Sequence, residues 1–242
     1  MGEVALRFYA ELNDLVPRPR LTRSFVGSPS VKDLIEAAGV PHTEVDLVLV
    51  DGQPVSFDHR VTDGARIAVF PVFETFDIAT VTKVRPRPLR SIRFVADGHL
   101  GKLARYLRLL GFDTDYSAQR DDAELVAISV GESRILLTRD RELLKHGSLT
   151  HGLLVRATDP DEQLVEIVAR LDLRRAMRPF CRCMSCNGEI ATAARDDVAD
   201  LLPPAVRAVQ DEFRRCSRCG RIYWRGSHAR RLEELVERVR EP

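Results

Sequence analysis

Two Cys-x-x-Cys pairs near the C-terminal end constrain the fold of this chain more than any other feature of its sequence. Cys183 pairs with Cys186, and Cys216 pairs with Cys219 at the same spacing. Each pair presents two sulfurs from one tight turn, and two pairs complete a tetrahedral set that suits structural Zn²⁺. Such a set leaves no open coordination position, so catalysis by this zinc is not expected. The sequence therefore predicts a zinc ribbon with these four ligands.

The fifth cysteine, Cys181, lies outside this symmetric spacing. It competes with Cys183 for the first ligand position, and the spacing favours Cys183. All 5 cysteines follow residue 180, which in a reducing compartment indicates metal binding rather than a disulfide framework or a redox dithiol. With no apolar run of membrane-spanning length and no signal-peptide pattern, the expected location is the cytoplasm, without membrane association.

Charge is unevenly distributed along the chain. Residues 1–80 hold 7 Lys and Arg against 12 Asp and Glu, whereas residues 174–231 hold 13 against 6. All cations in that C-terminal part are arginine, whose planar fork suits phosphate. Two interpretations explain this composition equally well: a codon bias toward arginine, and a surface that faces nucleic acid.

The middle of the chain alternates short apolar runs with amphipathic runs of helical period. Strands are expected at 92–96, 112–116, 134–138 and 152–155. Helices are expected at 100–110, 124–130, 141–145 and 162–171. This βαβαβαβα order predicts a parallel sheet covered by helices.

Acidic residues follow two of these predicted strands. Asp97 comes directly after the first strand, and Asp140 follows the strand at 134–138. The carboxyl ends of parallel strands meet at one edge of a sheet, which Asp122 at the start of the intervening helix can reach. Three carboxylates repel one another unless a hard cation such as Mg²⁺ or Mn²⁺ neutralises them. This pattern predicts a metal site able to activate water against a phosphodiester.

Helix capping is the competing interpretation of each acid. Asp121 and Glu124 form an Asp-x-x-Glu capping box, so we assign Asp121 to structure. Asp97 and Asp140 also precede helical runs, but their equivalent places at two strand ends favour the metal site. The helix after Asp97 carries cations on its polar face, a surface that suits a phosphate backbone. Those cations are Lys102, Arg105 and Arg108.

Residues 1–80 have the pattern of a small α+β module. A hairpin is expected from 4–9 and 22–26, a serine-capped helix over 28–39, and a two-residue turn at Asp51-Gly52 between later strands. This order resembles the ubiquitin-like β-grasp of sulfur-carrier proteins. That family works through a free C-terminal Gly-Gly, whereas here the chain continues after Phe70-Pro71-Val72. The difference favours an accessory domain that docks a protein partner over a carrier.

The run from Phe94 to Asp113, followed by Arg134 to Asp140, resembles the Mut7-C family of PIN-like ribonuclease domains. The likeness extends through the cysteine region, over residues 92–230, and an N-terminal β-grasp extension is also known in this family. The resemblance implies metal-dependent RNA cleavage by acids at Asp97, Asp122 and Asp140. Glu142 matches a fourth position that is often acidic.

The function predicted from these features is a divalent-metal-dependent ribonuclease that acts on RNA, with tRNA as one candidate. The alternatives are a non-catalytic RNA-binding or adaptor protein, and a toxin-like nuclease held inactive by a partner or by its own β-grasp domain. The expected order is a β-grasp domain at 1–80, a linker at 81–91, a PIN-like domain at 92–173, and a zinc ribbon with a C-terminal helix at 174–242. The predicted RNA-binding residues are Lys102, Arg105, Arg108, Arg139, Arg221 and Trp224, although Trp224 is equally suited to packing the ribbon onto the nuclease domain.

Overall fold

The computed structural model describes residues 1–71, 81–84 and 92–241 of the chain. The predicted linker lies largely outside these residues. The described chain divides into two compact units. The first contains Met1–Ser91 with Asp121–Leu154, and the second contains Ile92–Arg120 with Val155–Pro242. The domain boundaries expected from the sequence stay a prediction.

The N-terminal part of the first unit is a β-grasp. Its five strands lie in the order β2-β1-β5-β3-β4, and β1 pairs antiparallel with β2 but parallel with β5. Alternate side chains of β1, such as Leu6 and Phe8, are buried against the sheet's covering elements because successive residues of a strand face opposite ways. The strands are β1 (Gly2–Phe8), β2 (Arg20–Phe25), β3 (Val45–Val50), β4 (Gln53–Pro54) and β5 (Arg66–Pro71).

Local sequence signals account for the turns of this module. Helix α1 (Val31–Ala37) begins at a capping box in which the Ser30 hydroxyl accepts from Asp33 N, and it is followed by Gly39 at φ 104°. Asp51 and Gly52 both have positive φ, as the predicted two-residue hairpin turn requires. The β-grasp, its first hairpin and its capped helix are therefore confirmed.

The rest of the first unit contacts this module through β9 (Gly152–Leu154) and the 3₁₀ turn η4 (Leu143–Lys145). It also contains α3 (Asp122–Glu132) and β8 (Ile135–Thr138), with β8 and β9 parallel. The expected helix over 141–145 is wrong, because only the three residues of η4 are helical. The carboxylate of Asp140 binds the backbone N–H groups of Glu142 and Leu143 and so makes a tight turn instead.

Contacts through the 3₁₀ turn η2 (His42–Glu44) join the β-grasp to β9 and η4. His42 is 5% exposed; its Nε2 lies 2.8 Å from Leu149 O, and its Nδ1 lies 2.6 Å from Glu36 Oε1. The buried Glu44 accepts from Leu154 N at 2.5 Å. The β-grasp therefore supports the segment that follows Asp140.

The second unit begins with a parallel β-α-β element. Strands β6 (Arg93–Ala96) and β7 (Asp113–Tyr116) pair in parallel, with α2 (Gly101–Leu109) as the crossover. Leu103, Ala104 and Leu107 of α2 are fully buried. Helix α4 (Pro160–Arg170) packs on α2, and the 3₁₀ turn η5 (Leu173–Ala176) follows it. The parallel pairing here and at β8 and β9 agrees with the predicted central α/β fold.

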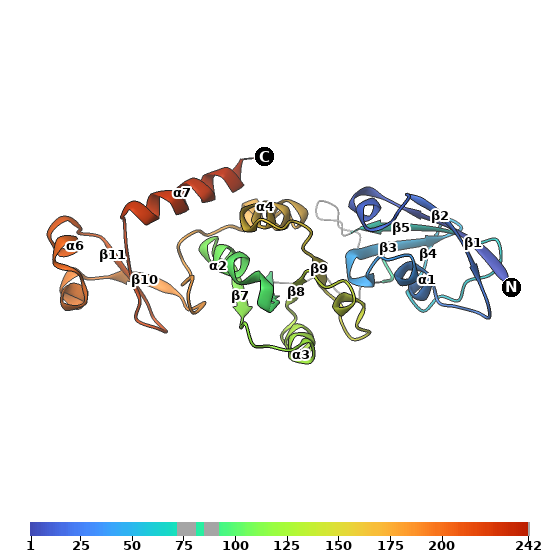
Figure 1. Cartoon of the computed structure of the whole chain (residues 1–242), viewed down its shortest axis with the longest axis horizontal. Coiled ribbons are helices and arrows are strands. Elements are labelled where there is room, and N and C mark those ends of the chain that lie inside the picture. The colour runs from blue at the N-terminus through green and yellow to red at the C-terminus, as the bar shows by residue number, and fades with distance from the viewer. Residues whose placement is uncertain (72–80, 85–91, 242) are drawn as a thin grey trace. The chain divides into compact units, whose positions relative to one another are not determined.

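The C-terminal part of the second unit is a small antiparallel sheet in the order β10-β11-β12. Val198, Leu202 and Phe213 form its core. The C-terminal end of the last helix, α7 (Ser227–Arg240), contacts α4 (Figure 1). The remaining elements of this part are β10 (Ile190–Ala193), α5 (Arg195–Val198), the 3₁₀ turn η6 (Ala199–Leu201), α6 (Pro204–Val209), β11 (Phe213–Cys216) and β12 (Ile222–Trp224). Among the described residues, no helix has both the length and the apolar character that crossing a bilayer requires.

Candidate functional site

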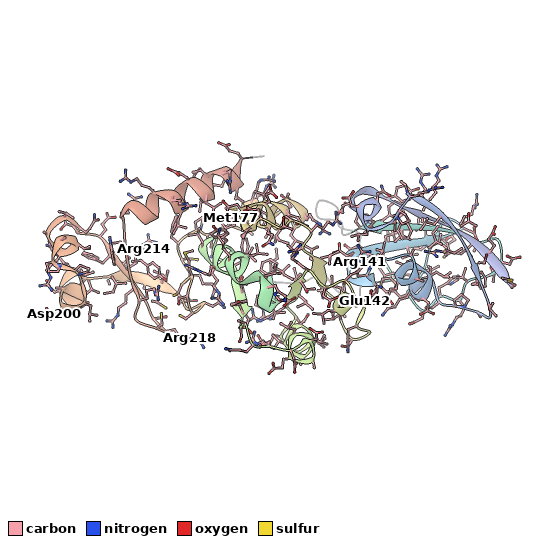
Figure 2. The ribbon with its side chains drawn as sticks, in the orientation of Figure 1. Arg141, Glu142, Met177, Asp200, Arg214 and Arg218 are labelled. Atoms are coloured by element: carbon pink, nitrogen blue, oxygen red, sulfur yellow. The ribbon has the colours of Figure 1, made fainter. Side chains whose placement is uncertain are left out.

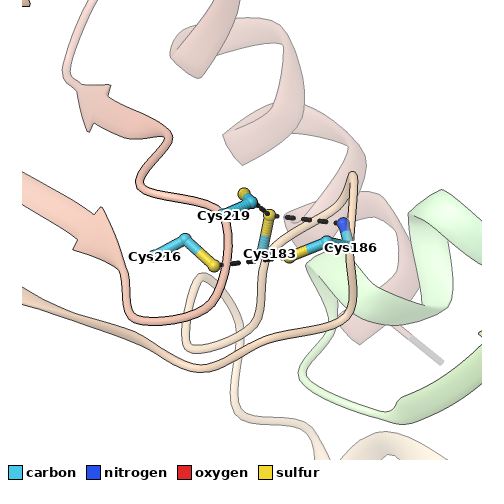
Figure 3. Close-up of side chains that lie close together, drawn as sticks. All are labelled: Cys183, Cys186, Cys216 and Cys219. Carbon is cyan, nitrogen blue, oxygen red and sulfur yellow. Dashed lines mark hydrogen bonds between the residues drawn. The ribbon is translucent and has the colours of Figure 1, made fainter.

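Four cysteine sulfurs meet beside β11. The ligand atoms of Cys183, Cys186, Cys216 and Cys219 all lie within 4.8 Å of one another (Figure 3). The Sγ atoms of Cys186 and Cys216 are 3.4 Å apart, and those of Cys183 and Cys219 are 3.7 Å apart. In a tetrahedral site with Zn–S bonds of about 2.3 Å, neighbouring sulfurs are roughly 3.8 Å apart. The geometry thus fits a structural metal such as zinc, as the spacing predicted.

Tight turns hold the two pairs of sulfurs. The carbonyl of Cys183 accepts from Asn187 N at 2.9 Å, and that of Cys216 accepts from Gly220 N at 3.0 Å. Asn187 and Gly220 have positive φ, the backbone conformation such turns need. At Gly188, a Cβ atom would lie 2.9 Å from Cys216 Sγ, so a side chain there would press on the ligand set. Cys181 lies outside the cluster, which the symmetric spacing also indicated.

Tyr223 supports the ligand set, a role that no spacing in the sequence marks. Its Oη lies 3.0 Å from Cys183 Sγ, and burial together with that contact raises the pKa of Tyr223. Burial alone would raise the pKa of the Cys183 thiol, but bonds from Tyr223 and the Cys186 N–H lower it to about 6. Burial, with the nearby sulfurs of Cys219 and Cys216, raises the pKa of Cys186 to about 12. Sulfurs this close repel one another when charged, and a bound dication relieves the repulsion.

Arg108 fastens the first cysteine turn to the β-α-β element. This arginine is 4% exposed, and its guanidinium donates to Thr114 O at 2.9 Å, Met184 O at 3.2 Å and Ser185 O at 3.0 Å. Asn187 adds a second link, because its Oδ1 accepts from Thr114 N at 3.1 Å. Burial lowers the pKa of Arg108, and the charge of Asp115 opposes that shift. The expectation that Arg108 faces RNA is therefore wrong: its charge is directed inward, onto carbonyls.

Replacing Arg108 by methionine is expected to lower the free energy of unfolding by about 2–4 kcal/mol, since buried carbonyls would lose a charged donor. Urea unfolding followed by circular dichroism measures the change. Arg105→Met is the matched control on the same helix, because Arg105 is exposed, and it should alter stability by less than about 0.5 kcal/mol. If Arg108→Met left stability intact and weakened RNA binding, the inward role of Arg108 would be wrong.

Asp97 lies at the carboxyl end of β6, half-buried, before the 3₁₀ turn η3 (Gly98–Leu100). Its side chain makes no capping hydrogen bond to that turn. The neighbouring glycines let Tyr116 of β7 approach closely. Its Oη donates to Gly98 O at 3.0 Å, and a Cβ atom at Gly101 would lie 2.5 Å from Tyr116 Oη. The Asp-Gly-His-Leu-Gly stretch is thus shaped by packing, whereas the Asp97 carboxylate is not used as a helix cap.

The acids of the first unit divide between structural and available roles. Asp121 caps α3 through the capping box with Glu124, as predicted. Asp122, the next residue, is exposed in the first turn of that helix. Asp140 accepts from the backbone N–H of Glu142 at 2.7 Å and of Leu143 at 3.3 Å, both through Oδ1. These bonds close the turn before η4, whose N-cap residue is Glu142, and they engage one of the two carboxylate oxygens of Asp140.

The two side chains that follow Asp140 have different partners. Arg141 donates to Leu15 O of the β-grasp at 3.4 Å, while Glu142 is exposed and pairs with Lys145 at 2.6 Å; Figure 2 labels both residues. Asp97 belongs to the second unit, and Asp122, Asp140 and Glu142 belong to the first. Within the described ranges, a group of three or more Cys, His, Asp or Glu side chains close enough to share an ion is found at the four cysteines and not at the acids. The shared site of the three acids stays a prediction.

Of the predicted RNA-binding residues, Arg105, Arg139, Arg221 and Trp224 are exposed. Lys102 is exposed as well, but its Nζ lies 3.8 Å from Asp161 Oδ1. The other carboxylate oxygen, Asp161 Oδ2, lies 2.9 Å from Arg238 Nη2. Burial would raise the pKa of Asp161, but its bonds to Arg238 and Tyr106 and the charge of Lys102 lower it. This cluster joins α2, α4 and α7, so Lys102 serves the fold as well as the surface.

Residues 92–236 match the family model of the Mut7-C RNAse domain. The chain belongs to the Mut7-C family. Residues 1–77 also match the model of the Mut7-C ubiquitin domain, so both halves of the resemblance stated above are confirmed. No curated protein matches the chain.

Among solved structures, a putative molybdopterin converting factor, subunit 1, from Pyrococcus furiosus is similar, with 24% identity and a TM-score of 0.26. It aligns over 30% of this chain and 100% of its own. SAMP1 from Haloferax volcanii is similar with 18% identity and a TM-score of 0.26, over 31% of this chain and 100% of its own.

Proposed function

We propose that this Mut7-C protein is a divalent-metal-dependent ribonuclease of the cytoplasm. The observation that carries the proposal is the match of residues 92–236 to the RNAse domain of the family. Asp97 adds to it, because its side chain makes no capping bond to the turn it precedes. A carboxylate at a strand end that is not needed as a cap has the position and chemistry of a metal ligand.

The acids fit Mg²⁺ or Mn²⁺ by their chemistry, since both ions prefer carboxylate oxygens. Asp97, Asp122 and Asp140 would hold the ion, with Glu142 as a fourth acid. When bound, such an ion activates water and stabilises the charge that develops on a phosphodiester. Exposed arginines would hold the RNA backbone through charge-assisted hydrogen bonds. The cleavage experiment described next also identifies the RNA target, for which tRNA is one candidate.

RNA cleavage by the purified full chain tests the proposal. Labelled RNA is incubated with zinc-loaded protein, with and without added Mg²⁺ or Mn²⁺, and the RNA ends are sequenced. Cleavage is expected only with the added metal, because the carboxylates alone cannot neutralise the developing charge. Equal cleavage without added metal would reject the metal-dependent mechanism.

A non-catalytic RNA-binding protein is the second candidate, and one observation favours it. Asp140 already binds two backbone N–H groups, as a helix cap does. On this alternative, the chain binds RNA in a salt-sensitive manner and produces no new RNA ends under any metal condition.

For the β-grasp we propose a supporting role rather than self-inhibition. Its residues contact the segment that follows Asp140, through Arg141 to Leu15 and through Glu44 to Leu154. The proposed metal ligand Asp140 therefore lies next to residues that the β-grasp holds in place. An additional protein partner of the β-grasp is compatible with this role.

Glu44→Ala is expected to destabilise the protein by about 1–3 kcal/mol and to lower RNA cleavage, because it removes the buried carboxylate that accepts from Leu154 N. Thermal unfolding and the cleavage rate are the measurements. Asp58→Ala, at an exposed position of the same module, should change neither. A faster cleavage rate in Glu44→Ala would support self-inhibition and contradict the supporting role.

A further inference from the structure

A groove of about 1300 Å³ lies between α2 and the cysteine-bearing sheet, within the second unit. This volume exceeds the roughly 300–1,000 Å³ typical of small-molecule pockets. Its walls come from several places in the sequence: α2 contributes Arg105, the cysteine turn contributes Met184, and the strands β10, β11 and β12 with the start of α7 contribute most of the rest. The groove therefore suits a chain-like ligand more than a metabolite.

The lining of the groove is cationic. Six arginines line it, against three acids, Asp211, Glu212 and Glu233. Some of these arginines serve the fold: Arg108 is buried, Arg182 donates to Asn187 O at 2.8 Å, and Arg225 pairs with Glu233 at 3.6 Å. Arg214, labelled in Figure 2, donates to Phe180 O at 3.3 Å. Arg105 and Arg221 are exposed, and among the described residues no hydrogen bond or ion pair engages their guanidinium groups.

Aromatic rings lie among these cations. Trp224 is 37% exposed at the end of β12, beside Tyr223 of the same strand. Tyr223 is held by Cys183, whereas Trp224 lines the groove and is partly exposed, so its ring is accessible to a ligand. Bases stacked within a duplex cannot reach such a ring, but the splayed bases of a single strand can stack on it.

We infer that this groove binds single-stranded RNA, with Trp224 stacking on a base and with Arg105 and Arg221 holding the flanking phosphates. The choice of RNA rests on the proposed function; the choice of a single strand rests on the groove itself. Cys216 and Cys219 hold the turn between β11 and β12, the strand that ends at Trp224, so binding also depends on an intact cysteine site. The groove thus gives the proposed nuclease a preference for unpaired segments of its substrate.

Fluorescence anisotropy with a labelled oligouridylate of about 12 nucleotides, a length within the range of single-strand site sizes, tests this inference. The protein is the full zinc-loaded chain without added Mg²⁺ or Mn²⁺, so cleavage does not interfere. Trp224→Ala should raise Kd about tenfold, and Trp224→Phe, which keeps a stacking ring, should raise it less than about threefold. Arg105→Ala with Arg221→Ala should lower the slope of log Kd against log salt by about 1.4.

Arg215→Ala is the matched control, because Arg215 is an exposed arginine on β11 that does not line the groove. It should leave Kd within about twofold of the wild type. Zinc content and the melting temperature confirm that each variant is folded. Wild-type affinity in folded Trp224→Ala, or equally tight binding of a duplex of the same length, would overturn the inference. Tight single-strand binding by a chain that never cleaves RNA would reject the nuclease proposal and leave the groove standing.

Discussion

Asp97→Asn is expected to lower the rate of metal-dependent RNA cleavage by about a thousandfold. A Lewis-acid metal contributes several kcal/mol to stabilisation of the transition state, and each 1.36 kcal/mol is a factor of ten in rate. The neutral amide keeps the size of the carboxylate but removes the charge that the cation needs. Because Asp97 makes no capping bond to η3, the substitution should not unfold that turn. The measurement is single-turnover cleavage of labelled RNA at saturating Mn²⁺.

Two neighbouring aspartates provide a matched control for this result. Asp121 caps α3, and Asp122 is the exposed residue that follows it. Asp121→Asn should keep activity within about twofold, because asparagine caps helices as well as aspartate does. Asp122→Asn should reduce cleavage strongly. If the double variant Asp97→Asn with Asp140→Asn cleaved RNA at the wild-type rate, the three-acid mechanism would be abandoned.

Loss of one cysteine ligand is expected to have the largest effect on folding. Cys186→Ser should release the bound zinc and unfold the sheet that carries Trp224, because structural zinc contributes about 10–16 kcal/mol in small zinc-binding peptides. The four sulfurs lie within 4.8 Å of one another, and a shared metal ion would fasten the two turns together. Zinc content, limited proteolysis and single-strand RNA affinity should all change in this variant.

Cys181→Ser is the control for the cysteine prediction. Cys181 lies outside the cluster, so this variant should bind the same amount of zinc as the wild type and resist protease equally. Equal zinc loss in both variants would mean that Cys181 takes part in the ligand set. Unchanged zinc content in Cys186→Ser would reject the four-cysteine site.

Most of the architecture was predictable because its signals are local. The capping box at Ser30, the positive-φ turn at Asp51-Gly52 and the two Cys-x-x-Cys turns each depend on a few consecutive residues. The prediction of a helix at 141–145 was wrong for an equally local reason. There, the side chain of Asp140 competes for the backbone N–H groups and ends the regular structure after a single turn.

By itself, the sequence determined the β-grasp module, most of the central order of strands and helices, and the four clustered cysteines, because periodicity, caps and ligand spacing act within short windows. Tertiary structure alone decided which charges face solvent. Arg105 and Arg108 are three residues apart on one helix, yet the first is exposed and the second is buried on the carbonyls of a turn more than seventy residues later. That difference depends on what packs against each side of α2, and helical spacing does not encode it.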